Sequence, residues 1–253
     1  MTTVLVWTDL APRPGWQQMA LDEAAIDIAR DDDVTLLRLY RWDTNTVSFG
    51  AHEMATRTWN RHALKTAGIP VVRRPTGGRA VWHDSDDLTY SVAARLPPST
   101  ALRDFYRTTH EELALALDSL GLPTAMAPSL PRTPSLSAGA CFEAAVGGEV
   151  LVAGTKAIGS AQLVRQGVML QHGAIARRDP LIRLDAFLLN APGRQGAGAR
   201  DVLPEAPTIA AAIEGRWRVR GATTAPARLT QRVEAASVHY SPRYHDASWT
   251  WRR

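Results

Sequence analysis

The order in which helical and strand patterns follow one another constrains this fold more than any other feature of the sequence. Residues 34–50, 69–96 and 140–176 read as runs of strands, and helical patterns lie between and beyond them. The two patterns therefore come in mixed runs and do not alternate one by one, as they do around a parallel sheet. We expect an α+β fold with a mixed, largely antiparallel sheet and flanking helices.

The helical segments are predicted from helix-forming composition, from apolar spacing and from end signals. Gly15 to Arg30 is rich in alanine, and Ser99 is a candidate cap for a long helix that Gly121 ends. The predicted helices cover residues 15–30, 57–67, 100–120, 208–214 and 226–236.

Two local strand pairings are predicted from turn signals. Residues 34–42 and 46–50 read as a hairpin, because only three residues separate them, and 87–96 continues as an alternating strand. If Gly147-Gly148 closes a two-residue hairpin, Cys141 lies opposite Gly154.

Composition excludes several classes of protein. The chain has 253 residues, of which 45% are hydrophobic and 21% charged, and its single cysteine excludes an internal disulfide framework or a cysteine metal cluster. No apolar run approaches the roughly 20 residues of a membrane-spanning helix, and no secretory signal pattern begins the sequence. We expect one domain over residues 1–253, located in the cytoplasm and not bound to a membrane.

The basic residues are distributed unevenly by type. The chain has 29 Lys+Arg against 25 Asp+Glu, a net charge of +4, which favours acidic partners. The arginines are dispersed, so nucleic-acid binding is not expected. Lys65 and Lys156 are the only lysines, and a lysine retained where nearly every cation is arginine is a candidate for a chemical role.

The stretch RRPTGGRAVWHD at 73–84 is the most unusual segment. Gly77 and Gly78 allow the backbone to approach a ligand closely, and consecutive N–H groups in such a turn can hold an oxygen atom. A plain glycine hairpin with solvated arginines explains the segment equally well when it is taken alone. His83 could act as a base, or could be an ordinary hydrogen-bonded residue.

Cys141 and Lys156 form the second candidate constellation. The hairpin register above would bring both to the same end of the sheet, roughly 10 Å apart between backbones. A nearby ammonium favours the thiolate, so this pair suits acyl transfer through a thioester. A lone cysteine is also often a small buried apolar residue, and a lysine beside a turn can be a solvated cation. No zinc-protease, serine-hydrolase or P-loop motif is present.

Several segments together resemble the lipoate/octanoate attachment family, which comprises lipoate–protein ligases and octanoyltransferases and shares its fold with biotin–protein ligases. Their order along the chain is that of the family, and the cysteine before the GTKAIGSAQ element is most similar to the LipM-type octanoyltransferases. The segments are MALDEA (19–24), RLYRWDTNTVSFG (38–50), RRPTGGRAVWHDSDDLTYSV (73–92), CFEA (141–144), GTKAIGSAQ (154–162) and LQHGAI (170–175).

The resemblance implies a site and a reaction. Cys141 would accept an octanoyl group from acyl carrier protein, and Lys156 would orient the acyl carbonyl. A lysine of an acidic lipoyl domain or of the glycine cleavage H protein would then attack the thioester, with no metal or ATP required. The implied pocket residues are Arg74, Thr76, Gly77, Gly78, His83, Gly159, Ser160, Ala161 and Gln162.

Two other functions remain open at this stage. An ATP-dependent lipoate–protein ligase would use Lys156 and the glycine turn to hold an acyl adenylate. A non-catalytic module that only binds lipoyl or biotinyl domains would show affinity for its partner without turnover.

Overall fold

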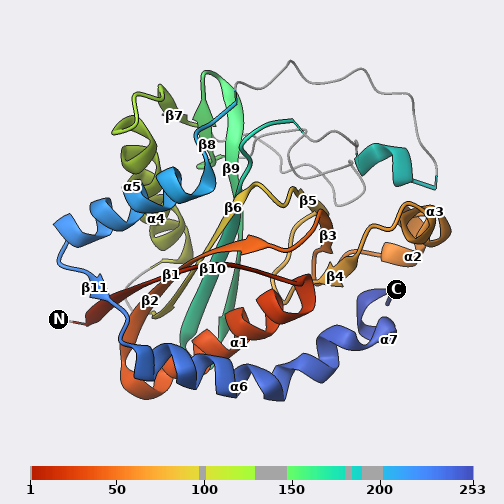
Figure 1. The fold of residues 1–253 in the computed structure, drawn as a ribbon, viewed down its shortest axis with the longest axis horizontal. Coiled ribbons are helices and arrows are strands. Elements are labelled where there is room, and N and C mark those ends of the chain that lie inside the picture. The colour runs from red at the N-terminus through yellow and green to blue at the C-terminus, as the bar shows by residue number, and fades with distance from the viewer. Residues whose placement is uncertain (1, 97–100, 129–146, 180–183, 190–201, 253) are drawn as a thin grey trace.

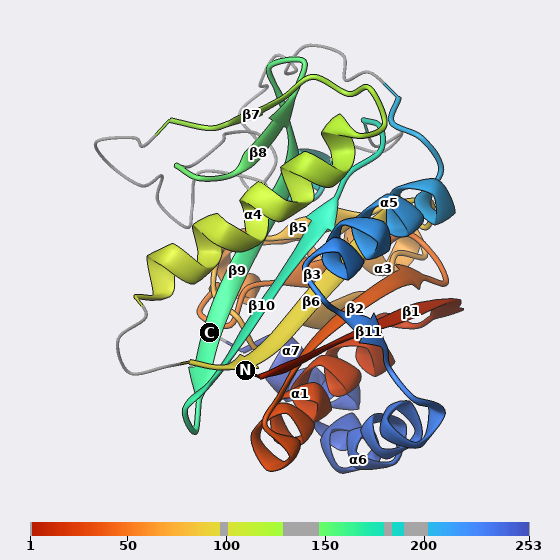
Figure 2. The same cartoon turned by 90° about the vertical axis from the view of Figure 1, so that its left-hand side faces the viewer.

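A computed structural model describes residues 2–96, 101–128, 147–179, 184–189 and 202–252 (Figure 1). Within these residues the chain forms an eight-stranded sheet, a separate three-stranded sheet, and helices on both faces of the larger sheet (Figure 2). The strands are β1 (Thr3–Arg13), β2 (Val34–Trp42), β3 (Thr46–Phe49), β4 (Val71–Arg73), β5 (Val81–His83), β6 (Leu88–Arg95), β7 (Thr124–Met126), β8 (Val150–Val152), β9 (Thr155–Arg165), β10 (Val168–Ile175) and β11 (Thr223–Thr224). The helices are α1 (Gly15–Asp32), α2 (Ala55–Thr58), α3 (Arg61–Thr66), α4 (Leu102–Asp118), the 3-10 helix η2 (Leu184–Phe187), α5 (Ala206–Val219), α6 (Ala227–His245) and α7 (Ala247–Thr250).

The large sheet is mostly antiparallel, as the sequence predicted. Its strand order is β11-β1-β2-β6-β10-β9-β8-β7, and every neighbouring pair from β2 to β7 is antiparallel. Only β1 runs parallel to its neighbours, β11 and β2. The α+β class is therefore confirmed.

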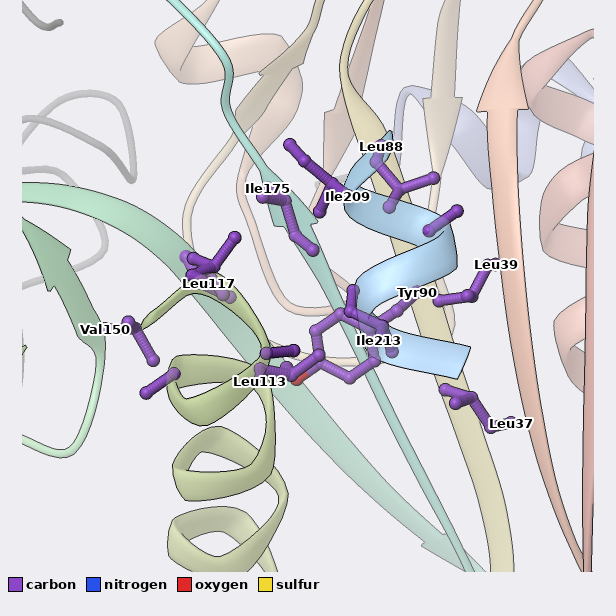
Figure 3. Packing of buried hydrophobic residues seen from close by; sticks show 14 of the residues in the cluster. Leu37, Leu39, Leu88, Tyr90, Leu113, Leu117, Val150, Ile175, Ile209 and Ile213 are labelled. Atoms are coloured by element: carbon purple, nitrogen blue, oxygen red, sulfur yellow. The ribbon is translucent and has the colours of Figure 1, made fainter. Parts of the chain in front are cut away.

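Alternate residues of the sheet belong to two different cores, because successive side chains of a strand point to opposite faces. Leu36 packs with α1 and α6, whereas Leu37 packs with α4 and α5. Figure 3 shows the second of these cores, in which Leu113 of α4 and Ile213 of α5 approach Tyr90 of the sheet.

Helix α1 is buried on most sides, because it contacts both the sheet and α6. Its alanines at 20, 24, 25 and 29 are all buried, and their small side chains permit close approach on both sides. The helix predicted for 15–30 is confirmed.

The predicted hairpin of 34–42 and 46–50 is wrong, although both strands exist. β2 has β1 on one edge and β6 on the other, so neither edge is open to β3. Asn45 accepts a hydrogen bond from the backbone N–H of Ser85, and the connection carries the chain into the smaller sheet. There β3 lies between β4 and β5, in the order β4-β3-β5. The segments on either side of the Gly77-Gly78 turn therefore do not pair with each other, and the plain hairpin interpretation of that turn is also wrong.

The single helix predicted for 57–67 is divided into α2 and α3. Trp59 is extended and buried, and its indole N–H donates to Glu53 Oε1 over 2.8 Å. Asn60 then caps α3, since its side chain accepts from the N–H of Ala63. A tryptophan that must reach the core thus interrupts the helical run.

The register that placed Cys141 opposite Gly154 is also wrong. β8 pairs with β7 on one side, where Thr124 faces Val152, and with β9 on the other, where Val152 faces Thr155. Both edges of β8 are therefore occupied by strands other than the segment that precedes Gly147. Cys141 itself lies outside the described residues.

The remaining predictions agree closely with the structure where it describes the chain. The strand predicted for 87–96 is β6, and the meander is confirmed over 150–175. The long central helix begins at Leu102, with Ser99 outside the described residues, and the two C-terminal helices extend beyond their predicted bounds as α5 and α6. In the part of the chain that is described, no helix has the length and apolar character to span a membrane.

Candidate active site

A cavity lies between the smaller sheet and strands β2, β6, β9 and β10 of the larger one. The empty space in this cavity and at its mouth, open solvent included, is about 430 Å³. Its lining combines apolar and polar residues from distant parts of the sequence: Met19, Tyr40, Trp42, Ser48, Arg74, Gly78, Val81, His83, Thr89, Gly159, Ser160, Ala161, His172, Gly173 and Ala174.

The Gly77-Gly78 turn crosses directly over the end of β3. A Cβ atom on Gly50 would lie 1.8 Å from the carbonyl oxygen of Gly78, so this crossing requires glycine at position 50. Gly78 has a φ of 90°, in the left-handed region, and is exposed at the edge of the cavity. The close backbone contact that the structure shows thus requires Gly50, which the sequence did not single out, and the positive φ of Gly78 favours glycine at that position.

Arg74 holds this turn from inside. Its guanidinium donates to the carbonyl oxygens of Gly77 and Arg79, each over 2.8 Å, and to the carbonyl of Ser48 over 2.9 Å. The side chain is buried and also lines the cavity. Arg74 therefore shapes the loop as well as contributing to the cavity wall.

His83 lines the cavity and is held by one of its two ring nitrogens. Its Nε2 lies 2.8 Å from Ser48 Oγ, and its ring stacks on Trp42 with centroids 4.1 Å apart. Arg74 also donates to Ser48 Oγ over 3.2 Å, and the serine oxygen can either accept from Nε2–H or donate to Nε2. Among the described residues, Nδ1 is buried without a hydrogen-bond partner.

Burial keeps His83 neutral. Desolvation lowers its pKa well below the ordinary value, and the charge of Arg74 and the nearby His172 lower it further. His83 is therefore an uncharged polar residue of the cavity lining.

His172 is fixed from both sides. Its Nδ1 lies 2.8 Å from Asp22 Oδ2, and its Nε2 lies 2.6 Å from Thr76 Oγ1. Asp22 also accepts from the hydroxyl of Tyr40 and pairs with the buried Arg38. This chain of contacts ties the glycine loop to α1 and β2.

Lys156 lies behind the cavity wall, in an ion pair with a carboxylate. Its Nζ is 2.7 Å from Glu149 Oε1, and both side chains are at most 3% exposed. A Cβ on Gly159 would lie 2.7 Å from the Cε of Lys156 and 3.0 Å from its Nζ. Gly159 therefore leaves the space that allows the ammonium group to approach the cavity.

Ser160 belongs to a chain of hydrogen bonds with a determined direction. His110 Nδ1 lies within hydrogen-bond distance of the Gly148 carbonyl, which can only accept, so its Nε2 must accept from Ser160 Oγ over 2.7 Å. Tyr90 OH lies 2.6 Å from the same Oγ and accepts from Gln171 Nε2, so it is free to donate to the serine. Burial foremost lowers the pKa of His110 to about 4, and the charge of Lys156 also lowers it.

The structure brings most of the predicted site residues together. Those that line the cavity are Arg74, Gly78, His83, Gly159, Ser160 and Ala161. Gly77 and Thr76 support the loop from behind, and Lys156 lies behind Gly159. Gln162 does not line the cavity, because its amide donates to Gln171 and to the Leu102 carbonyl. Cys141 lies outside the described residues.

Sequence reasoning missed several residues of the site. Asp22 stands within the MALDEA segment, and Glu149 directly follows the Gly147-Gly148 pair, so an acidic residue beside each motif was the available signal. His110 and Tyr90 carried no signal, because an α4 helix pattern and an alternating strand account for both. Over the described residues, no group of three His, Cys, Asp or Glu side chains is arranged to hold a metal ion.

Comparison with known proteins gives consistent results. The family described as "Lipoyl protein ligase A/B catalytic domain" matches residues 14–200. The chain is 34% identical to the octanoyltransferase LipM of an Exiguobacterium species, over 94% of each protein, and 33% identical to that of Symbiobacterium thermophilum, over 97% of each.

Solved structures show a similar fold. Lipoate-protein ligase A bound with ATP superposes with a TM-score of 0.74 at 22% identity, covering 99% of this chain and 98% of the other. A bipartite lipoate protein ligase from Thermoplasma acidophilum gives 0.73 at 23% identity, covering 98% and 96%. At these identities the likeness establishes the architecture.

Proposed function

The chain belongs to the lipoyl protein ligase A/B catalytic domain family, and on that premise we propose that it transfers an octanoyl group through a thioester on Cys141 to a lysine of an acceptor protein. It is an acyltransferase, as are the octanoyltransferases that it resembles over nearly its whole length. The donor is octanoyl-acyl carrier protein, and the acceptor is a lipoyl domain or the glycine cleavage H protein.

The observation that carries this proposal is the buried ammonium group of Lys156 behind Gly159. A charge in a water-poor wall acts on a reacting carbonyl more strongly than it would in water. The same charge favours the thiolate form of a cysteine brought close to it. Lys156 can therefore orient the acyl carbonyl and support a thiolate nucleophile.

The reaction proceeds in two balanced steps. The Cys141 thiolate attacks the carbonyl carbon of the octanoyl thioester, a new C–S bond forms, and the carrier thiolate leaves. The neutral amine of the acceptor lysine then attacks the enzyme thioester, the C–S bond breaks, and an amide forms as the amine gives up one proton. The Cys141 thiolate is thereby restored, and neither a metal nor ATP takes part.

The cavity has the properties that an eight-carbon acyl group requires. Met19, Trp42 and Val81 supply apolar surface against which the hydrocarbon part of the acyl group can pack.

A transfer assay tests the proposal. Purified enzyme is mixed with octanoyl-acyl carrier protein and an apo lipoyl domain, with and without ATP, and acylation of the domain is followed by mass spectrometry. We expect acylation that does not depend on ATP and is absent in Cys141→Ala. If acylation requires free octanoate and ATP, the protein is a ligase that uses an acyl adenylate, and the thioester route is wrong.

A further inference from the structure

The segment 54–83 is unusually one-sided in charge. It contains six Lys and Arg residues and no Asp or Glu, whereas acidic residues stand on both flanks at Glu53 and Asp84. The excess is local, because the whole chain is nearly balanced.

The fold divides these six cations into an inner and an outer set. Arg73, Arg74 and Arg79 are buried. Arg57 of α2 and Arg61 and Lys65 of α3 are exposed, on two short helices that the extended Trp59 separates. We call these last three residues the basic face.

The basic face lacks the ion pairs that most other exposed arginines form. Arg107, Arg218 and Arg232, for example, each bind a carboxylate. Within the described part of the chain, the exposed cations without such a pair are Arg57, Arg61, Lys65, Arg103 and Arg228. Arg61 lies over the ring of Trp251, with 5.2 Å to its centroid. The basic face therefore carries positive charge that no carboxylate of its own neutralises.

Apolar side chains border the same face. Met54, which precedes α2, is 49% exposed, and Leu189 is 48% exposed. The N–H of Leu189 donates to the carbonyl of Thr58, so this residue lies directly against α2. Met54 and Leu189 therefore offer apolar surface next to the unpaired cations.

The basic face is rigidly connected to the edge of the cavity. Arg73 donates to the carbonyl oxygens of Gly50 and Glu53, over 2.7 and 2.8 Å, and Glu53 in turn accepts from the N–H of Gly50. Gly50 lies against the exposed Gly78, which lines the cavity. The residues just before α2 are thus tied to the loop that lines the cavity.

Two carboxylates lie near this region. Glu53 is buried, and burial raises its pKa. Its carboxyl group therefore does not neutralise the positive charge that the basic face presents to solvent. Asp185 lies on η2, which contacts α3, and is half-buried with interactions of its own.

We propose that the basic face docks the acceptor protein through an acidic surface that surrounds its target lysine. The inference rests on the proposed function, which requires a macromolecular lysine to reach the cavity. A lone lysine is a cation and is repelled by this face, so acidic residues around it are needed to bring it in. Opposite charges across an interface accelerate encounter and orient the partners.

A charge-reversal pair and a matched control test this docking surface. The test enzyme carries Arg57→Glu and Lys65→Glu, and the control carries Arg103→Glu and Arg228→Glu, which change the net charge equally on α4 and α6, away from α2 and α3 (Figure 1). Formation of the acyl-enzyme, transfer to an apo lipoyl domain, and binding of that domain are measured separately.

We expect the KM for the acceptor to rise at least about tenfold in the test enzyme and less than about threefold in the control. The difference should shrink at high salt, which screens exposed charges. Equal KM values in both enzymes would overturn the proposal. Slower acyl-enzyme formation with unchanged transfer would also overturn it, because the face would then dock the donor.

Failure of the proposed function gives a different result. In that case the wild-type enzyme forms no acyl-enzyme and transfers no acyl group. Binding of the apo domain is then the measurement that tests the docking surface. Weaker binding by the test enzyme than by the control supports the surface, and equal binding contradicts it.

Discussion

The two walls of the cavity hold their polar groups in different ways. On the loop wall, Arg74 donates to backbone carbonyls, which leaves the glycine turn in one shape. On the β9 wall, Lys156 and Ser160 are paired with the side chains of Glu149 and His110, which can exchange partners when a substrate arrives. From this difference we expect the loop wall to shape the site and the β9 wall to take part in the chemistry.

Removal of the Lys156 ammonium should have the largest effect on the β9 wall. We expect Lys156→Met to reduce transfer by about 10²–10³-fold or more, since a charge aimed at the reacting carbonyl is lost. The variant leaves Glu149 buried without this partner, so Lys156→Met with Glu149→Gln serves as the control for folding. Activity near wild type in the soluble double variant would rule out an electrostatic role for Lys156.

Glu149→Gln should have the next largest effect. The ammonium of Lys156 loses the carboxylate that positions it, and we expect kcat to fall about 10- to 100-fold with a smaller change in KM. Glu112 offers a matched control, because it is also buried and paired, with Arg216 and Arg220, on helices away from the cavity. Equal losses in Glu149→Gln and Glu112→Gln would mean that the Glu149 effect is one of stability alone.

Gly50→Ala tests the loop wall. The added Cβ would meet the Gly78 carbonyl at 1.8 Å, so the turn must move away from β3. We expect a KM increase of about tenfold with kcat less affected, because the loss is one of shape. Gly215→Ala in α5, where nothing lies within 4 Å of the added atom, should leave the kinetics unchanged. A purely kcat effect of Gly50→Ala would contradict the division between the walls.

The smallest effect concerns stability and pH. His110 has a folded-state pKa of about 4, against about 6.5 in an unfolded chain, so acid favours the unfolded state. Its contribution is complete above pH 6.5 and is lost as the pH falls toward 4, with about 2 kcal/mol lost by pH 5. In urea titrations at pH 7 and pH 5, we expect His110→Gln to show a smaller loss of stability than the wild type. The variant His239→Gln changes an exposed histidine and should lose as much stability as the wild type does. Equal losses of stability in all three proteins would contradict a neutral, buried His110.

The parts of the site that lie in short segments were predictable from sequence. The two glycines, His83, and the strand from Gly159 to Ala161 were found because each carries its signal within a few residues. His110 could not be found, since its partner Ser160 lies 50 residues away and only tertiary packing joins them. The hairpin predicted for 34–42 and 46–50 was wrong for the same reason. Alternation of apolar and polar residues identifies a strand, but it does not show which strand pairs with it.

If transfer proceeds through a thioester, Cys141 carries the acyl group, and intact-protein mass spectrometry can detect it there. The enzyme and its Cys141→Ala variant are each mixed with octanoyl-acyl carrier protein in the absence of ATP and of any acceptor. We expect one octanoyl adduct on the wild type, mapped to Cys141 by peptide analysis and removed by an apo lipoyl domain, and none on the variant. A wild-type enzyme without an adduct that still acylates the acceptor would contradict the account.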